Sequence, residues 1–164
     1  MNYVIRKRKK EDCKYIQKII TRCWQDTYRG IINDEYLDSL SDNEEERIKN
    51  SENNFDENST YLVIEIDNKV VGFTKYGVSI KEGYGEIFAL YLLKEYQGNG
   101  YGKKLVASAI EELRKMNFNK ILIGCLKDNP SNKFYEHLGG KVVDTRIFER
   151  SGQKLLENVY CYDI

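Results

Sequence analysis

The sequence predicts a single α/β domain, built on a mixed, mostly antiparallel sheet of about seven strands with helices on both faces. Three observations support this. The chain has 164 residues, a length at which one domain buries about 70% of its unfolded surface. Runs with strand periodicity alternate with runs of helical periodicity along the whole chain. The sequence shows no internal repeat and no linker, so one domain over residues 1–164 is expected.

Seven short apolar runs predict the strands. They cover residues 3–6, 61–66, 69–78, 86–93, 121–125, 141–148 and 155–164. The fourth run is almost continuously apolar, which is typical of a central strand buried on both faces. The second and third runs flank a short polar turn, and the last two flank a Ser-Gly turn, so each pair predicts a hairpin. Gly72 and Gly77 are expected to mark β-bulges.

Helical spacing predicts two amphipathic helices, one from Asp12 to about Trp24 and one through residues 105–116. A third helix is expected to begin at Asn129-Pro130, with asparagine as the N-cap and proline in the first turn, and to end before Gly139.

Composition restricts the class of protein. The 26 basic residues are balanced by 26 acidic ones, so no net positive charge favours a nucleic acid. No apolar run reaches the length of a membrane span, and charged residues interrupt the first apolar residues before a signal peptide could form. We therefore expect a soluble, cytoplasmic protein with no nucleic-acid or membrane partner.

Cysteine and histidine usage gives no metal-binding pattern. The four cysteines include no CxxC pair, and they are expected to be reduced and mostly buried. His137 is the single histidine, and we expect it to lie on a helix surface or to pack rather than to bind a metal.

The clearest functional signal is the glycine-rich turn at residues 97–102, QGNGYG, between the central strand and the following helix. Glycines allow a tight turn and a close ligand, and the free N–H groups at a helix start favour a phosphate. The spacing matches neither GxxxxGK[ST] nor GxGxxG. The turn is thus a candidate pyrophosphate site, and the alternative is a turn without a ligand.

Two sequence blocks resemble the GCN5-related N-acetyltransferase (GNAT) family. The first is Gln97-x-x-Gly100-x-Gly102 after the strand at 89–92, and the second is NPSNKFYEHLGG at 129–140. Residues 24–30, WQDTYRG, are similar to the first helix and loop of small bacterial members. The resemblance implies transfer of acetyl from acetyl-CoA to a primary amine, in a fold with splayed central strands. No motif places a cysteine to carry the acetyl group, so direct attack in a ternary complex is expected.

The resemblance also implies the acetyl-CoA site, in the gap between the splayed strands. Pyrophosphate would lie on the backbone of the glycine-rich turn, pantetheine along the central strand, and the thioester carbonyl near the Leu92 N–H. Asn129 would bond pantetheine, with helix capping as its alternative role. The implied contacts are Leu90, Tyr91, Leu92, Gln97, Gly98, Asn99, Gly100, Tyr101, Gly102, Lys103, Asn129 and Tyr135.

Acetyl transfer needs a base and an acid, because an ammonium must lose a proton and the departing thiolate gains one. Glu86, at the start of the central strand, is the candidate base, and its alternative role is an exposed charge at a strand end. Tyr135 matches the family's general acid, with packing on the sheet as the alternative.

The acceptor is less well defined by the sequence. Trp24 and Tyr28 lie where similar proteins border the acceptor, although Trp24 equally suits core packing. Residues 34–57, with ten acids against two bases and short helical patterns, predict a solvated flap. Its acids could attract a cationic acceptor, and the favoured alternative is a solvated helix face. The basic cluster at 6–10 is assigned as a surface turn. A small amine, polyamine or amino-acid-like, is expected, and the alternatives are a protein acceptor or a non-catalytic acyl-CoA-binding module. The terminal hairpin suggests a homodimer.

Overall fold

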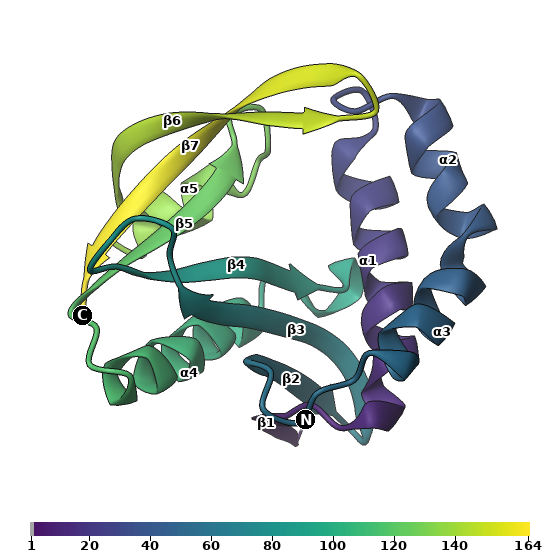
Figure 1. Cartoon of the computed structure of the whole chain (residues 1–164), viewed down its shortest axis with the longest axis horizontal. Coiled ribbons are helices and arrows are strands. Elements are labelled where there is room, and N and C mark those ends of the chain that lie inside the picture. The colour runs from purple at the N-terminus through teal and green to yellow at the C-terminus, as the bar shows by residue number, and fades with distance from the viewer. Residues whose placement is uncertain (1) are drawn as a thin grey trace.

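The computed structural model describes residues 2–164, which form a seven-stranded mixed sheet covered by helices on both faces (Figure 1). The elements in chain order are β1 (Tyr3–Lys7), α1 (Cys13–Tyr28), α2 (Asp34–Asp42), α3 (Glu44–Asn53), β2 (Tyr61–Ile66), β3 (Lys69–Val78), β4 (Gly85–Leu92), α4 (Tyr101–Lys115), β5 (Lys120–Leu126), α5 (Asn132–His137), β6 (Lys141–Arg150) and β7 (Gln153–Asp163). The predicted fold class is confirmed.

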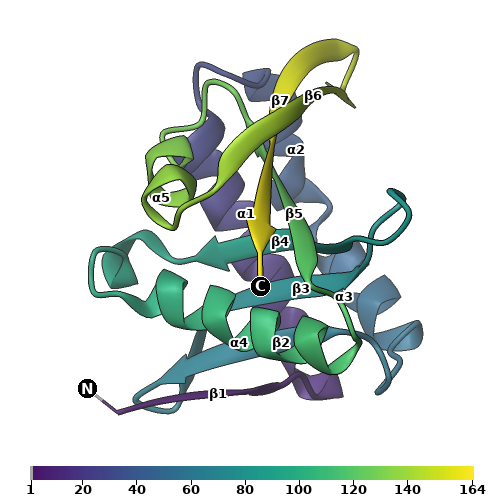
Figure 2. The same cartoon turned by 90° about the vertical axis from the view of Figure 1, so that its left-hand side faces the viewer.

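The strand order is β1-β2-β3-β4-β5-β7-β6, and only the β4–β5 pair is parallel. Helices α1 to α3 cover one face, whereas α4 and α5 lie on the other (Figure 2). The apolar stripe of α1 packs Ile16 and Ile19 on Phe73 of β3, and that of α4 buries Leu105 and Leu113 against the opposite face. Both helices thus fix the sheet from the two sides.

The parallel pair β4–β5 is short. It holds only three residue pairs, the last being Ile87 with Ile123, after which the strands separate. The separation begins where Phe88 forms a bulge, because Ile87 and Ala89 pair with consecutive residues of β3. A bulge bends and twists its strand, so β4 turns away from β5 at this point. The predicted splay is therefore present, and it leaves a cleft.

The predicted bulges are partly wrong. One bulge falls at Val71, beside Gly72, but Gly77 pairs regularly with Glu86. A side chain at Gly77 would begin 3.3 Å from the ring of Phe88, so this glycine accommodates the bulged residue of β4.

The acidic segment is not a solvated flap. It forms α2 and α3, which pack on α1 and bury Leu37 and Leu40. Arg47 joins α3 to α1 through hydrogen bonds to the Gln17 side chain (2.8 Å) and to Thr21 Oγ1 (2.5 Å). The helices α2 and α3 are therefore held against α1 by packing and hydrogen bonds.

The predicted start of α5 is also wrong, because the helix begins at Asn132 rather than at Pro130. The Asn129 Oδ1 atom accepts a hydrogen bond from the Ser131 N–H (2.8 Å), which closes a local turn. Asn129 therefore does not cap the helix, and its side-chain amide is directed elsewhere.

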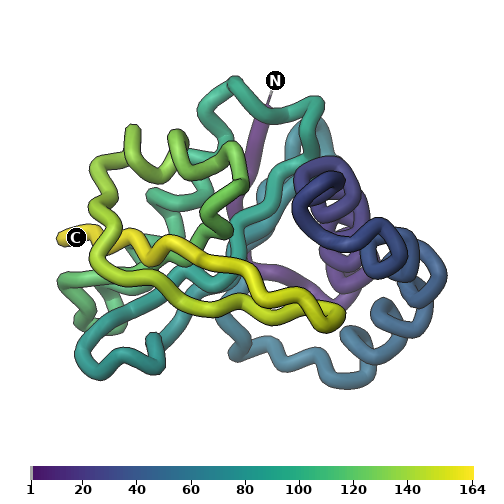
Figure 3. Tube along the Cα trace, turned by 90° about the horizontal axis from the view of Figure 1, so that it is seen from above, coloured from purple at the N-terminus to yellow at the C-terminus, as the bar shows by residue number. Residues whose placement is uncertain are grey.

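The β6–β7 hairpin ends against the loop between α1 and α2 (Figure 3). Gln153 Oε1 accepts a hydrogen bond from the Asn33 N–H (2.7 Å) at this contact. Strand β6 is an edge of the sheet and exposes Val143 and Ile147. A homodimer through this edge stays a prediction.

Within the described residues, no helix has the length and apolarity to span a membrane. Cys13, Cys23 and Cys125 are buried and Cys161 is half-buried, all as free thiols. His137 is exposed on α5, with Nδ1 2.6 Å from the Lys133 carbonyl oxygen. The expected burial of most cysteines and the surface position of His137 are thus confirmed.

Candidate active site

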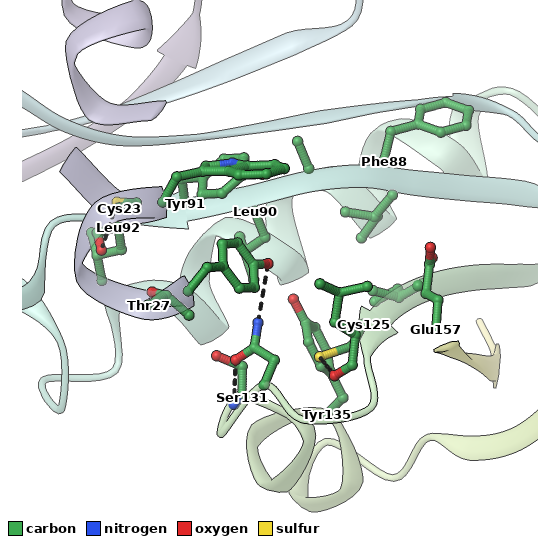
Figure 4. A pocket seen from close by; sticks show the side chains of 18 of the residues that line it. Cys23, Thr27, Phe88, Leu90, Tyr91, Leu92, Cys125, Ser131, Tyr135 and Glu157 are labelled. Carbon is green, nitrogen blue, oxygen red and sulfur yellow. Dashed lines mark hydrogen bonds between the residues drawn. The ribbon is translucent and has the colours of Figure 1, made fainter. Parts of the chain in front are cut away.

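The cleft between β4 and β5 is the candidate active site (Figure 4). One wall is β4 from Ile87 to Leu92, the other is β5 from Ile123 to Leu126. The end of α1 closes it from one side, while Tyr135 of α5 and Glu157 of β7 enter from the other. Of the predicted residues, the structure brings together Trp24, Tyr28, Leu90, Tyr91, Leu92, Gln97, Asn129 and Tyr135.

The glycine-rich turn opens α4 and presents backbone donors. Gly98 and Gly100 have φ angles of +78° and +81°, a region that side chains with a Cβ rarely adopt. In residues 2–164, no acceptor is found for the amide N–H groups of residues 98–103. These free donors coincide with the positive end of a 15-residue helix, an arrangement that fits a pyrophosphate.

The other residues of the turn hold it in place. Gln97 donates from Nε2 to the Leu92 carbonyl (2.9 Å), which ties the turn to the end of β4. Asn99 donates to the Gln97 carbonyl (3.2 Å), and the side chain of Tyr101 is buried in the core under α4. Lys103 is exposed. A side chain at Gly102 would begin 3.4 Å from the ring of Phe134, in ordinary contact with α5.

The cleft edge of β4 fits an extended arm. From Phe88 to Leu92 this edge has no partner strand in the described chain, because β5 pairs only as far as Ile87. An acyl-pantetheine arm is lined with amides that can pair with such a free edge. The free strand edge and the free amides of the turn thus suit the two ends of acetyl-CoA.

Tyr135 has the environment of a proton donor. Its ring packs against Phe134 and Tyr160, and the side chain points into the cleft (Figure 4). Across the described residues its hydroxyl makes no hydrogen bond. Burial raises the pKa of the Tyr135 phenol far above its ordinary value, so the proton is held at neutral pH.

Trp24 and Tyr28 lie together at the α1 end of the cleft. Their rings meet edge-on at 4.9 Å, and Trp24 Nε1 donates to the Tyr91 hydroxyl (2.8 Å). Asn129 Nδ2 donates to the Tyr28 hydroxyl (3.3 Å). The two predicted acceptor residues therefore pack together and also line the cleft, and Asn129 joins the segment after β5 to the end of α1.

Two carboxylates lie near Arg146. Glu86 is only 6% exposed, accepts a hydrogen bond from Ser79 Oγ (2.8 Å), and has Oε2 3.4 Å from the Arg146 guanidinium. It is not among the residues that line the cleft. Glu157 does line it, and its Oε1 is 3.1 Å from Arg146 Nη2. Burial raises the pKa of Glu157, although Arg146 opposes this rise.

Gly124 makes room for the Glu157 carboxylate. A Cβ at position 124 would lie 1.5 Å from Glu157 Oε1 and 2.7 Å from Arg146 Nη2. Strand pairing explains this, since Leu126 of β5 pairs with Glu157 of β7 and Gly124 is two residues away on the same face. No sequence motif indicated Glu157, Arg146 or Gly124 as residues of the site. The lone glycine inside the apolar run ILIGCL was the available signal.

A comparison with protein families identifies the chain. The model of the acetyltransferase (GNAT) family matches residues 13–140. An uncharacterized N-acetyltransferase of Bacillus subtilis, YuaI, is 34% identical over 159 residues, with 93% of this chain and 88% of that protein covered. The chain belongs to the GNAT family and is an acyl-CoA-dependent N-acetyltransferase.

Two matches from Thermoplasma acidophilum have lower identity. A spermidine N(1)-acetyltransferase is 28% identical, with 88% of this chain and 92% of that protein covered. The crystal structure of PaiA N-acetyltransferase in complex with coenzyme A has a TM-score of 0.69 at 22% identity, with 96% of this chain and 98% of that chain covered. The latter likeness shows a shared fold.

Members of this family use acetyl-CoA as the cosubstrate. The glycine-rich turn and the cleft between β4 and β5 fit this molecule as described above. A search of residues 2–164 finds no group of three or more His, Cys, Asp or Glu side chains placed to hold a metal ion.

Proposed function

We propose that this enzyme transfers the acetyl group of acetyl-CoA to a primary amine of a small molecule, by direct attack in a ternary complex. The observation that carries the proposal is the cleft itself. It combines a free strand edge with a protonated phenol, Tyr135, and a carboxylate of raised pKa, Glu157. These are the groups that an amine acetylation requires.

Backbone groups would bind and orient acetyl-CoA. The free amides of residues 98–103 would hold the pyrophosphate, and the edge of β4 from Leu90 to Leu92 would hold pantetheine beside Asn129. Acetyl-CoA supplies an activated acetyl group as a thioester. A backbone N–H near Leu92 would stabilise negative charge on the thioester oxygen.

Tyr135 is the proposed general acid. Its phenol keeps its proton at neutral pH and has no competing hydrogen bond in the described part of the chain. It can therefore give the proton to the sulfur that leaves. Such a donor contributes about 10²–10⁴-fold to a rate.

Two carboxylates compete for the role of base. Glu86 as the base stays a prediction, and its contacts with Ser79 and Arg146 engage its oxygens outside the cleft lining. Glu157 fits the role better, because it lines the cleft and its raised pKa makes it more basic than an ordinary carboxylate. We propose that Glu157 accepts the proton of the acceptor ammonium, directly or through a water.

The cleft cysteines support direct attack rather than an acyl-cysteine route. Burial raises the pKa of Cys23 and of Cys125 to about 12. Both groups are therefore thiols at neutral pH, whereas a covalent route requires a thiolate.

The test measures CoA release from acetyl-CoA over a panel of polyamines, amino acids, aminoglycosides and short peptides, with a no-acceptor control. We expect turnover with one class of small amine. Turnover restricted to peptides would instead assign a protein acceptor. Thermal stabilisation by acetyl-CoA with no turnover of any acceptor would favour a non-catalytic acyl-CoA-binding module.

Three variants assign the roles on the best acceptor. Tyr135→Phe should lower kcat by about 10²-fold with little change in acetyl-CoA affinity. Glu157→Gln should have a similar effect, and Glu86→Gln should have a smaller one. Full activity of Glu157→Gln together with inactive, folded Glu86→Gln would return the base to Glu86.

A further inference from the structure

A second cavity, of about 340 Å³, adjoins the cleft on the face covered by α1 to α3. Its walls come from these helices, from β2 to β4 and from the end of β6. It shares the lining residues Trp24, Ala89 and Tyr91 with the cleft, so the two spaces meet at these side chains.

The cavity is lined by four cationic side chains and by no carboxylate. The cations are Arg8, Arg47, Lys75 and Arg150. None of them forms an ion pair with any residue from 2 to 164. Four positive charges around one pocket without a negative partner create a local potential that favours an anionic ligand.

The partners of these cations are neutral. Arg8 donates to Ser59 Oγ (2.7 Å) and lies 3.8 Å from the centroid of Tyr61, and Lys75 lies over the same ring. Arg150 lies 5.6 Å from the Trp24 ring, at the boundary with the cleft. Arg47 is bonded to neutral groups and secures α3. Lys75 and Arg150 make no side-chain hydrogen bond in the described chain, so their donors are available to a ligand.

The rest of the lining is mostly aromatic and aliphatic. Tyr36, Tyr61, Phe73 and Tyr91 surround the space together with Trp24. Such walls suit an apolar or aromatic body. The cavity therefore offers apolar contact along its length and positive charge around it.

We propose that the acceptor is an amine that also carries an anionic group, such as an amino acid, with the anion held by Lys75 and Arg150 and the amine directed past Trp24 into the cleft. This inference rests on the proposed function and names its acceptor class. The reaction is the same: the nitrogen–carbon bond forms, the carbon–sulfur bond breaks, and the acceptor proton and the thiolate proton pass through Glu157 and Tyr135.

The charge of the cavity disfavours a polyamine. Although residues 34–57 hold ten acids, none lines the cavity; α2 and α3 contribute Tyr36, Leu40, Arg47 and Ser51 instead. A spermidine molecule would bring further ammonium groups toward four cations. Like charges at a binding site act against a ligand even where its shape fits.

The test compares matched amines by CoA release: phenylalanine with phenethylamine, methionine with 3-(methylthio)propylamine, phosphoethanolamine with ethanolamine, and spermidine. We expect the anionic member of a pair to have at least about tenfold higher kcat/KM, the size of one charge-assisted hydrogen bond. The phosphoethanolamine arm shows whether a phosphate replaces the carboxylate. A higher kcat/KM for spermidine, or for the amines that lack the anionic group, would overturn the inference and leave the proposed function intact.

Two variants test the residues. Lys75→Met and Arg150→Gln change exposed side chains, so both should fold, and each should raise KM for the anionic acceptor about tenfold with KM for acetyl-CoA unchanged. Lys69→Met is the matched control, because Lys69 is exposed on the same strand as Lys75 but lies outside the cavity. Equal KM values in all four proteins would contradict the assignment.

A binding measurement separates this inference from the proposed function. N-acetylphenylalanine and N-acetylphenethylamine are titrated against the wild type by thermal shift or calorimetry. Preference for the acid without turnover of any amine would keep the anion site and reject the transferase proposal. Absence of a preference in both binding and turnover would reject the anion site.

Discussion

The Gly124→Ala substitution tests how the active-site carboxylate is placed. The new methyl group would lie 1.5 Å from Glu157 Oε1, against an ordinary contact of 3.4–4 Å, so the carboxylate must withdraw by about 2 Å. A misplacement of about 1 Å at a reacting group can cost about 100-fold in rate. We therefore expect kcat to drop by about 10²-fold while acetyl-CoA affinity changes little.

The same movement weakens the Arg146–Glu157 ion pair, which is partly buried. Losing a charged hydrogen bond of this kind lowers the free energy of unfolding by about 1–2 kcal/mol. In a domain of this size that corresponds to a Tm decrease of about 2–8 °C. A thermal melt and a CoA-release assay on the same sample measure both effects, and the melt shows that the variant is folded.

The decisive comparison is a double-mutant cycle with Glu157→Ala. If the methyl group acts only by displacing the carboxylate, Gly124→Ala has no further effect on kcat once Glu157 is absent. Wild-type kcat in Gly124→Ala would refute the reasoning. An equal loss in both backgrounds would also refute it, because the glycine would then act independently of Glu157.

Three further predictions follow from other parts of the molecule. Gly100→Val places a β-branched residue at a φ of +81°, so CoA affinity in calorimetry should weaken by at least about tenfold, and an unchanged Kd would argue against the pyrophosphate site. Because the pKa of Glu157 is raised, the pH profile of kcat/KM should show an ascending limb whose midpoint lies above the ordinary carboxylate pKa of about 4.3. If the profile of Glu157→Gln keeps this ascending limb, another group is the base. Burial acts to raise the pKa of Asp12, but hydrogen bonds from Arg6 and the Lys9 amide outweigh it and the pKa is lowered. The Asp12 carboxylate therefore stabilises the fold above its unfolded pKa of about 3.9, and this stabilisation is lost as the pH falls through the lower pKa of the folded state. Asp12→Asn should lower Tm at pH 7, and the Tm values of variant and wild type should converge near pH 2.

Much of the fold is predictable because its elements are periodic over short distances. The continuous apolar run of β4 and the stripe of α4 need no knowledge of the rest of the chain. The start of α5 was misplaced because two local signals compete: Asn129 suits an N-cap, but its side chain closes a turn with Ser131 instead. The short helical patterns of residues 34–57 were recognised, but the packing of α2 through Leu37 and Leu40 was not, because these few apolar residues are diluted by surface acids.

Some residues of the candidate site can be predicted from local motifs, whereas others cannot. The glycine-rich turn and Tyr135 lie in local motifs, and both are found in the sequence. Glu157 reaches the cleft only through the register of β7 on β5, and the cavity cations come from four separate elements. Arg8 illustrates the limit, since a basic run at the surface gives no sign that one of its members turns inward over Tyr61.

The short contact between β4 and β5 divides the sheet into two plates, β1 to β4 and β5 to β7. Their strand pairing is limited to three residue pairs, and side-chain contacts such as that of Arg146 with Glu86 also join them. A ligand lying along the open edge of β4 would act as a missing strand and connect the plates along their length. Cosubstrate binding should accordingly slow amide hydrogen exchange on both plates, including positions that the ligand does not touch.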